Sequence, residues 1–162
     1  EERCFVNLCN LAMSQRSLLV GEELFRFGMP GKNMYFLIDG YLSYFTGFDD
    51  KEPVEVNPGE WLSEATLWAK WEHRGRAITE FEAAELAVLD AAEFHTIVVQ
   101  TRSVVEVQRY ARLFCTRAVR ECGSSELITD IWGQCRTVSA IARRAFQLGD
   151  DTHNINKAVM LW

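Results

Sequence analysis

The sequence has few of the features that mark secreted, membrane-spanning or metal-binding proteins. Its five cysteines are an odd number without a Cys-x-x-Cys pair, so we expect reduced thiols rather than a disulfide framework. No apolar run approaches the roughly 18 residues that a bilayer span requires. The three histidines are scattered and offer no ligand cluster for zinc. We therefore expect no metal, no other cofactor and no membrane span, and a cytoplasmic location, alone or as the cytosolic domain of a membrane protein.

Enzyme motifs are also missing. The sequence has no Walker-type phosphate loop and suggests no Ser-His-Asp or Cys-His set. Glu64 and His73 could form an acid–base pair, but nothing places a substrate between them. We predict that the protein is not an enzyme.

Basic residues are outnumbered, with 17 Lys and Arg against 23 Asp and Glu, for a net charge of −6. Such a surface repels a phosphate backbone, so we do not expect nucleic acid as a partner. A small anionic ligand would need a local set of arginines. The 162 residues are 48% hydrophobic, which is enough to bury the core of a single domain. Because the chain lacks an initiator Met and a signal-peptide pattern, we expect an excised domain or a processed fragment.

The distribution of apolar residues predicts helices at both ends of the chain and strands between them. Apolar residues at helical spacing predict a helix over residues 2–14. Short β-prone runs with turn signals every eight to twelve residues then predict a sandwich or barrel. The candidate strands are 18–20, 24–27, 34–39, 41–46, 54–56, 76–81 and 86–90. Helical spacing returns at 91–100, 104–122, 126–132 and 137–148.

The most informative stretch is residues 58–79. It begins with a Pro-Gly turn and continues into a short small-residue segment around Ser63, which predicts the start of a brief helix. The unpaired backbone N–H groups of such a helix start favour an anion. Glu64 can accept hydrogen bonds from ribose hydroxyls, and Arg74 can donate two hydrogen bonds to a phosphate. The stretch therefore suits a sugar-phosphate ligand.

This stretch resembles the phosphate-binding cassette of the cyclic nucleotide-binding domain family. The family motif is Phe-Gly-Glu-x-Ala-Leu, followed by Arg-x-Ala about nine residues after the Glu. Here Leu62-Ser63-Glu64 stands where Phe-Gly-Glu is expected, and Arg74 follows Glu64 by ten residues. The resemblance thus implies a one-residue insertion near residues 70–73, with Arg76 as the alternative phosphate residue. Upstream, five further positions match the opening strands of the family: Gly21, Gly28, Gly31, Tyr35 and Gly40.

The resemblance implies an α+β fold, an antiparallel, jelly-roll-like β-roll with an N-terminal helix and C-terminal helices. Residues 1–123 would form the cyclic nucleotide-binding-like domain, including hinge and lid helices, and residues 124–162 a C-terminal helical extension. The ligand would be cyclic AMP or cyclic GMP. The implied ligand-binding residues are Ser63, Glu64, Ala65, Thr66, Arg74, Gly75 and Arg76. Gly75 stands where the family tends to carry Thr or Ser in proteins that prefer cyclic GMP, which favours cyclic AMP.

Three hypotheses for the function follow. In the first, the roll is a regulatory module that binds a cyclic nucleotide and transmits binding through its C-terminal helices to a channel or another effector. In the second, it binds no nucleotide and serves as an interaction or gating module. Ser63 at the glycine position and the bulky Trp68 and Trp71 raise this alternative, because the tryptophans either stack on a purine or fill the pocket. The third hypothesis is a transcription factor, since residues 128–144 faintly resemble a helix-turn-helix with Gly133 at its turn.

Overall fold

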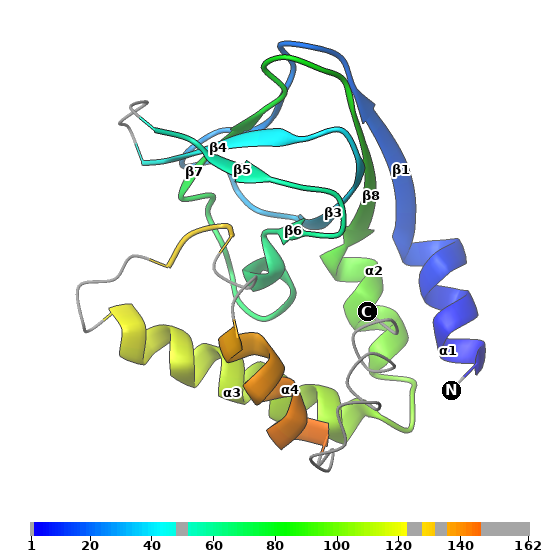
Figure 1. Cartoon of the computed structure of the whole chain (residues 1–162). Coiled ribbons are helices and arrows are strands. Elements are labelled where there is room, and N and C mark those ends of the chain that lie inside the picture. Colours follow the sequence, from blue (N-terminus) through cyan, green and yellow to red (C-terminus); the bar gives the residue numbers. More distant parts are fainter. Residues whose placement is uncertain (1, 48–51, 123–127, 132–135, 147–162) are drawn as a thin grey trace.

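A computed structural model describes residues 2–47, 52–122, 128–131 and 136–146, which form a two-sheet roll with helices at one end (Figure 1). Helix α1 (Glu2–Asn7) and one π-helical turn, η1 (Leu8–Ala12), precede the strands. The strands are β1 (Met13–Leu18), β2 (Glu23–Phe25), β3 (Asn33–Asp39), β4 (Leu42–Thr46), β5 (Val54–Val56), β6 (Trp61–Leu62), β7 (Gly75–Ile78) and β8 (Ala84–Asp90). A short 3-10 helix, η2 (Glu64–Leu67), lies between β6 and β7.

The strands form two antiparallel sheets of four, in the orders β1-β8-β3-β6 and β2-β7-β4-β5. The inward-facing side chains of the two sheets form one buried cluster, which includes Leu37, Leu42, Tyr44, Leu62 and Leu86. Successive side chains of a strand point to opposite faces of its sheet, and this places these residues on the inner faces. The predicted α+β roll is confirmed.

Gly40, in the turn between β3 and β4, adopts φ 76°, a conformation that side chains rarely take. A Cβ at this position would also lie 2.3 Å from the carbonyl oxygen of Ala83. The turn therefore requires glycine for both its backbone conformation and its close approach to β8. This is the turn that the Asp39-Gly40 pair predicted.

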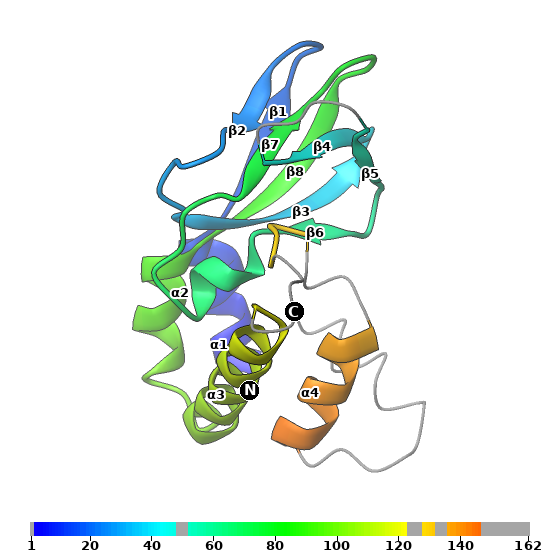
Figure 2. The same cartoon turned by 90° about the vertical axis from the view of Figure 1, so that its left-hand side faces the viewer.

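Three helices lie at one end of the roll, on the side of η2 (Figures 1 and 2). They are α2 (Ala91–Val98), α3 (Val104–Cys122) and α4 (Arg136–Phe146). The Asp90 carboxylate caps α2 by accepting two backbone N–H groups at 2.9 Å. One apolar cluster joins α3 and α4 to η2, and its buried members are Ala65, Tyr110, Phe114, Ile141 and Ala145. The helices are thus attached to the predicted cassette.

The structure differs from the sequence prediction at the first helical region, at β6 and at residues 128–131. The first helical region ends at Ala12, and residues 13–18 form β1 because they pair along their whole length with β8. Strand β6 was not predicted because it is only two residues long. The predicted helix over 126–132 is wrong in its described part, since residues 128–131 are not helical. Their polar groups instead bond to the roll. Gly133 and residues 147–162 lie outside the described residues.

Candidate functional site

The cassette begins with a strained residue. Ser63 has φ 63° and ψ 32°, the left-handed conformation, at the position where the family motif has glycine. A non-glycine residue there costs on the order of 1–2 kcal/mol unless its surroundings compensate. All four residues of η2, which follows, are buried: Glu64, Ala65, Thr66 and Leu67. The left-handed residue thus lies where the resemblance implies a glycine, and the side chain of Ser63 needs a role that offsets the strain.

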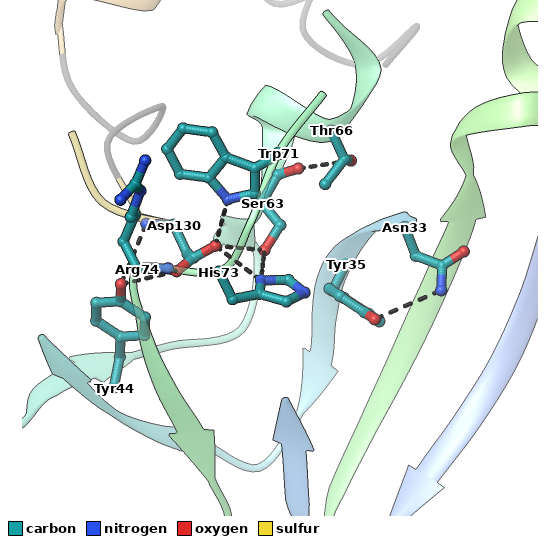
Figure 3. A network of polar contacts seen from close by, with 9 residues as sticks. All are labelled: Asn33, Tyr35, Tyr44, Ser63, Thr66, Trp71, His73, Arg74 and Asp130. Carbon is teal, nitrogen blue, oxygen red and sulfur yellow. Dashed lines mark hydrogen bonds and ion pairs between the residues drawn. The ribbon is translucent and has the colours of Figure 1, made fainter. Parts of the chain in front are cut away.

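That role is a hydrogen bond to the carboxylate of Asp130, a residue from the segment 128–131 (Figure 3). Asp130 Oδ1 accepts from the Ser63 hydroxyl at 3.2 Å, from the Trp71 indole N–H at 2.8 Å and from His73 Nδ1 at 2.8 Å. The bond to His73 requires the imidazole form that carries a proton on Nδ1. Three side chains of the segment 63–73 thus point at one oxygen.

The second carboxylate oxygen of Asp130 also accepts hydrogen bonds from the roll. Asp130 Oδ2 accepts from the Tyr44 hydroxyl at 2.9 Å and from the backbone N–H of Arg74 at 2.7 Å. We call these five donors the anion cradle: Tyr44 OH, Ser63 OH, Trp71 N–H, His73 Nδ1 and the Arg74 backbone N–H. The backbone of Asp130 is fixed as well, because its carbonyl accepts from Ser63 N–H at 2.6 Å and its N–H bonds the Tyr44 oxygen at 3.2 Å.

The Asp130 carboxylate is buried, with its side chain 0% exposed, so its ionisation depends on the cradle. Burial raises the pKa of Asp130, but hydrogen bonds from His73 and Trp71, the charge interaction with His73 and the Arg74 N–H together hold that pKa below its ordinary value. Burial, together with the negative charge of Asp130, raises the pKa of the Tyr44 phenol. The cradle is therefore built for a single negative charge.

His73 was not predicted as a site residue, although a signal for it was present. It lies nine residues after Glu64, which is the family interval for the phosphate arginine. Aligning Arg74 instead requires a one-residue insertion, whereas His73 needs none. His73 is 2% exposed, and its ring stacks on Phe25 with centroids 3.8 Å apart. An imidazole fixed by packing thus occupies the place at which the resemblance implies a guanidinium.

Glu64, the predicted ribose acceptor, is 6% exposed and already accepts three hydrogen bonds. Its donors are the Trp61 indole at 3.0 Å, the Trp68 indole at 3.2 Å and the Tyr110 hydroxyl at 2.5 Å. Burial raises the pKa of Glu64, and these three bonds oppose the increase. Since Tyr110 belongs to α3, Glu64 connects the cassette to the helices that follow the roll.

The two candidate arginines lie outside the cradle's interior. Arg74 is exposed, and its guanidinium carbon lies 5.6 Å from the Trp71 ring centroid. In Figure 3 its side chain points away from the Asp130 carboxylate, towards which only its backbone N–H is directed. Arg76 pairs with Glu23 at 3.4 Å and lies over the Phe45 ring at 4.7 Å. Whether either arginine binds a phosphate stays a prediction.

The remaining predicted site residues have structural contacts of their own. The Thr66 N–H and hydroxyl both bond the Ser63 carbonyl, at 3.0 and 2.8 Å. Ala65 is buried against α3 and α4. Gly75 is buried, and a Cβ there would lie 2.5 Å from the Tyr44 hydroxyl, a cradle donor. Trp68 packs edge-on against Phe94, so it fills core space.

Two further observations concern the described residues as a whole. Within them, no group of three or more His, Cys, Asp and Glu side chains is arranged to hold a metal ion. None of the helices in the described part of the chain has the length and apolar character that a bilayer span requires.

Comparisons with known proteins agree with the geometry. No family model matches the chain. A cyclic nucleotide-gated potassium channel of Mesorhizobium japonicum is 28% identical over 102 residues, which is 63% of this chain but 27% of the channel. The chain therefore spans about a quarter of that curated relative.

Solved structures extend the match to the fold. A cyclic nucleotide-binding-like protein of Brucella abortus is 25% identical with a TM-score of 0.53, over 62% of this chain and 86% of that protein. The regulatory domain of Toxoplasma gondii PKA, crystallised with cAMP, is 19% identical with a TM-score of 0.56, over 88% of this chain and 51% of that one. These names describe binding and regulatory proteins and a channel rather than enzymes. The resemblance to the cyclic nucleotide-binding domain family is confirmed.

Proposed function

We propose that this cyclic nucleotide-binding-type roll is a regulatory module that binds cyclic AMP or cyclic GMP and transmits binding through its C-terminal helices. The observation that carries the proposal is the anion cradle, in which five donors converge on one buried carboxylate. A cyclic phosphodiester carries the same single charge as that carboxylate and likewise offers two terminal oxygens. In the bound state, the phosphate takes the position of the Asp130 carboxylate.

The ribose site follows from the position of Glu64, which adjoins the cradle residue Ser63 in the chain. A ribose hydroxyl donates to the carboxylate of Glu64 in place of one of its present donors. Tyr110 is the donor that belongs to a helix behind the roll, so its exchange gives the ligand a way to move α3. Because Ala65 packs in the same cluster as Ile141 of α4, a shift of η2 reaches α4 as well. These contacts form the proposed route of transmission.

Base selectivity is the finer part of the proposal. Gly75 has no hydroxyl to offer a guanine, and Tyr44 leaves no space for a larger residue at that position. We therefore propose a preference for cyclic AMP. The effector would be the rest of a channel or another regulated domain, with the module on the cytosolic side of the membrane.

Calorimetric titration of the purified chain with cyclic AMP and cyclic GMP tests the proposal. His73→Gln removes the buried imidazole from the cradle, and we expect at least tenfold weaker binding, since one-sided loss of a shielded charged contact costs about 2–5 kcal/mol. The control is Arg16→Gln, because Arg16 is exposed on β1 and away from the cradle. Arg74→Ala and Arg76→Ala in the same series identify the phosphate arginine. Equal affinity of the His73→Gln variant and the wild type would refute the cradle as the phosphate site.

A second candidate function is an interaction or gating module that never exchanges Asp130 for a nucleotide. One observation favours it, namely that every cradle donor and the Glu64 carboxylate are already satisfied by the chain itself. Absence of heat on titration with either nucleotide, in the wild type and after removal of the Asp130 carboxylate, would select this candidate.

A further inference from the structure

The segment 128–131 has a conformation that its own sequence does not explain. Apolar spacing predicts a helix there, yet the segment is not helical and lies between the sheets and helices α3 and α4 (Figures 1 and 2). Ile128 is buried, and Ile131 packs against the cluster between the two sheets. Contacts with the roll therefore determine the conformation of this segment.

The polar contacts of the segment converge on Asp130, as the donors of a binding site converge on a bound anion. Asp130 makes seven hydrogen bonds to the roll, five through its carboxylate and two through its backbone. The partners of the side chain are 56 to 86 residues away in the chain. No other described acidic residue is both this deeply buried and this completely bonded, since the buried Glu64 accepts three bonds.

We infer that Asp130 is a tethered, displaceable ligand of the anion cradle, which competes with an external monoanion for the same donors. This inference rests on the proposed function, because the external monoanion is the phosphate of a cyclic nucleotide. The two occupants exclude each other, since each needs the hydroxyl of Tyr44 and the backbone N–H of Arg74. A cradle with the His73 imidazole in place of a guanidinium suits this exchange, because one ring N–H holds the carboxylate with fewer hydrogen bonds than a forked guanidinium and leaves it easier to remove.

Displacement of Asp130 has a structural consequence outside the cradle. Leaving the cradle also breaks the backbone bond from Ser63 N–H and withdraws Ile131 from the roll. The segment precedes α4, which is held on α3 by Ile141 and by a hydrogen bond from Arg109 to the Ala145 carbonyl at 3.0 Å. The occupant of the cradle therefore decides whether α4 is anchored to the roll from its N-terminal side.

With a tethered competitor, the apparent affinity for the external ligand equals the intrinsic affinity multiplied by the fraction of molecules whose cradle is open. Because effective concentrations of short tethers reach the millimolar range, an intramolecular ligand of even modest intrinsic affinity keeps the cradle filled. Weakening the tether should then strengthen nucleotide binding by at least about tenfold.

The test uses the full chain with Asp130→Asn. The amide keeps the shape of the carboxylate but replaces one acceptor oxygen with an NH₂ group, which is a donor. The backbone N–H of Arg74 is also only a donor, so it cannot bond an NH₂ group in that position. Glu85→Gln is the control, because it makes the same change in charge at an exposed position on β8. Cyclic AMP and cyclic GMP are titrated into all three proteins by calorimetry. The indole N–H resonance of Trp71 and the amide resonance of Arg74 are followed by NMR, and circular dichroism confirms folding.

We expect Asp130→Asn to bind cyclic AMP at least tenfold more tightly than the wild type and Glu85→Gln, with both NMR signals shifted before any ligand is added. Unchanged or weaker binding by folded Asp130→Asn overturns the inference. If neither nucleotide binds any of the proteins, the proposed function fails, and the tether is then judged by NMR alone. Shifted Trp71 and Arg74 signals with faster hydrogen exchange in α4 support a cradle held by Asp130, and unshifted signals overturn it.

Discussion

The hydrogen bond from Tyr110 to Glu64 is the sharpest test of how α3 is coupled to the roll. Tyr110→Phe removes one hydroxyl and keeps the ring, whose centroid lies 5.1 Å from the centroid of the Trp68 ring. The lost bond ends on a carboxylate that is 6% exposed, and hydrogen bonds to charged groups contribute about 1.5–3 kcal/mol. We therefore expect the free energy of unfolding to fall by about 2 kcal/mol, a decrease in Tm of roughly 4–8 °C for a chain of this length.

Urea denaturation at pH 7 measures the change, and Tyr41→Phe is the matched control. Tyr41 is half-buried, its hydroxyl bonds no other residue in the described ranges, and its loss should cost less than about 0.5 kcal/mol. Glu64→Gln completes a double-mutant cycle, in which Tyr110→Phe should cost only about 0.5–1.5 kcal/mol because the remaining bond is neutral. An equal cost of Tyr110→Phe in both backgrounds would refute a charge-assisted bond, and a cost below 0.5 kcal/mol would refute the coupling itself.

Three further predictions concern Glu64, Gly75 and Asp90. Because burial raises the pKa of Glu64, the folded state holds this proton more tightly than the unfolded chain. The contribution of Glu64 to stability should therefore be lost as pH rises from about 4 through the raised pKa. Urea titrations at several pH values should show the free energy of unfolding of the wild type falling relative to that of Glu64→Gln over this pH range. Gly75→Ala would place a Cβ 2.3 Å from the Phe45 carbonyl and 2.5 Å from the Tyr44 hydroxyl, so thermal denaturation should show a loss of stability of about 1–3 kcal/mol. Asp90→Ala removes the cap of α2 and should cost about 1 kcal/mol in the same assay, whereas Asp90→Asn should preserve most of it.

The architecture was predictable because alternation and glycine positions are local properties. The Asp39-Gly40 pair predicted a turn, and φ 76° at Gly40 explains why. Strand β1 was placed too late in the chain because four of its six side chains are exposed and carry no alternating pattern. Its pairing with β8 decides its structure, and pairing partners are not visible in a single sequence.

The candidate site was predictable only on the side that belongs to the cassette. Ser63 and Glu64 follow from a motif, and His73 was within reach through the nine-residue interval. Asp130 could not be found in this way, since 57 residues separate it from His73 and its own surroundings predict a helix. Burial, rather than sequence, identified it, because a fully covered carboxylate must have donors around it.

The boundary expected at residue 123 stays a prediction, and the structure adds a constraint on it. Ile141 and Ala145, from beyond that boundary, share a buried cluster with Tyr110 and Phe114 of α3. Asp130, also from beyond it, supplies the charge that the cradle holds. A chain that ended at residue 123 would leave both the cluster and the cradle without these partners.

The long separation between Tyr44 and Asp130 also affects the order in which the molecule can assemble. Both sheets are complete at residue 90, so during synthesis the roll can close around its apolar interior before Asp130 exists. Contacts between residues so distant in sequence form late and slowly, since the loop between them must first be closed. The nascent roll therefore passes through a stage with an open cradle, and the chain supplies the first anion only when its C-terminal part arrives.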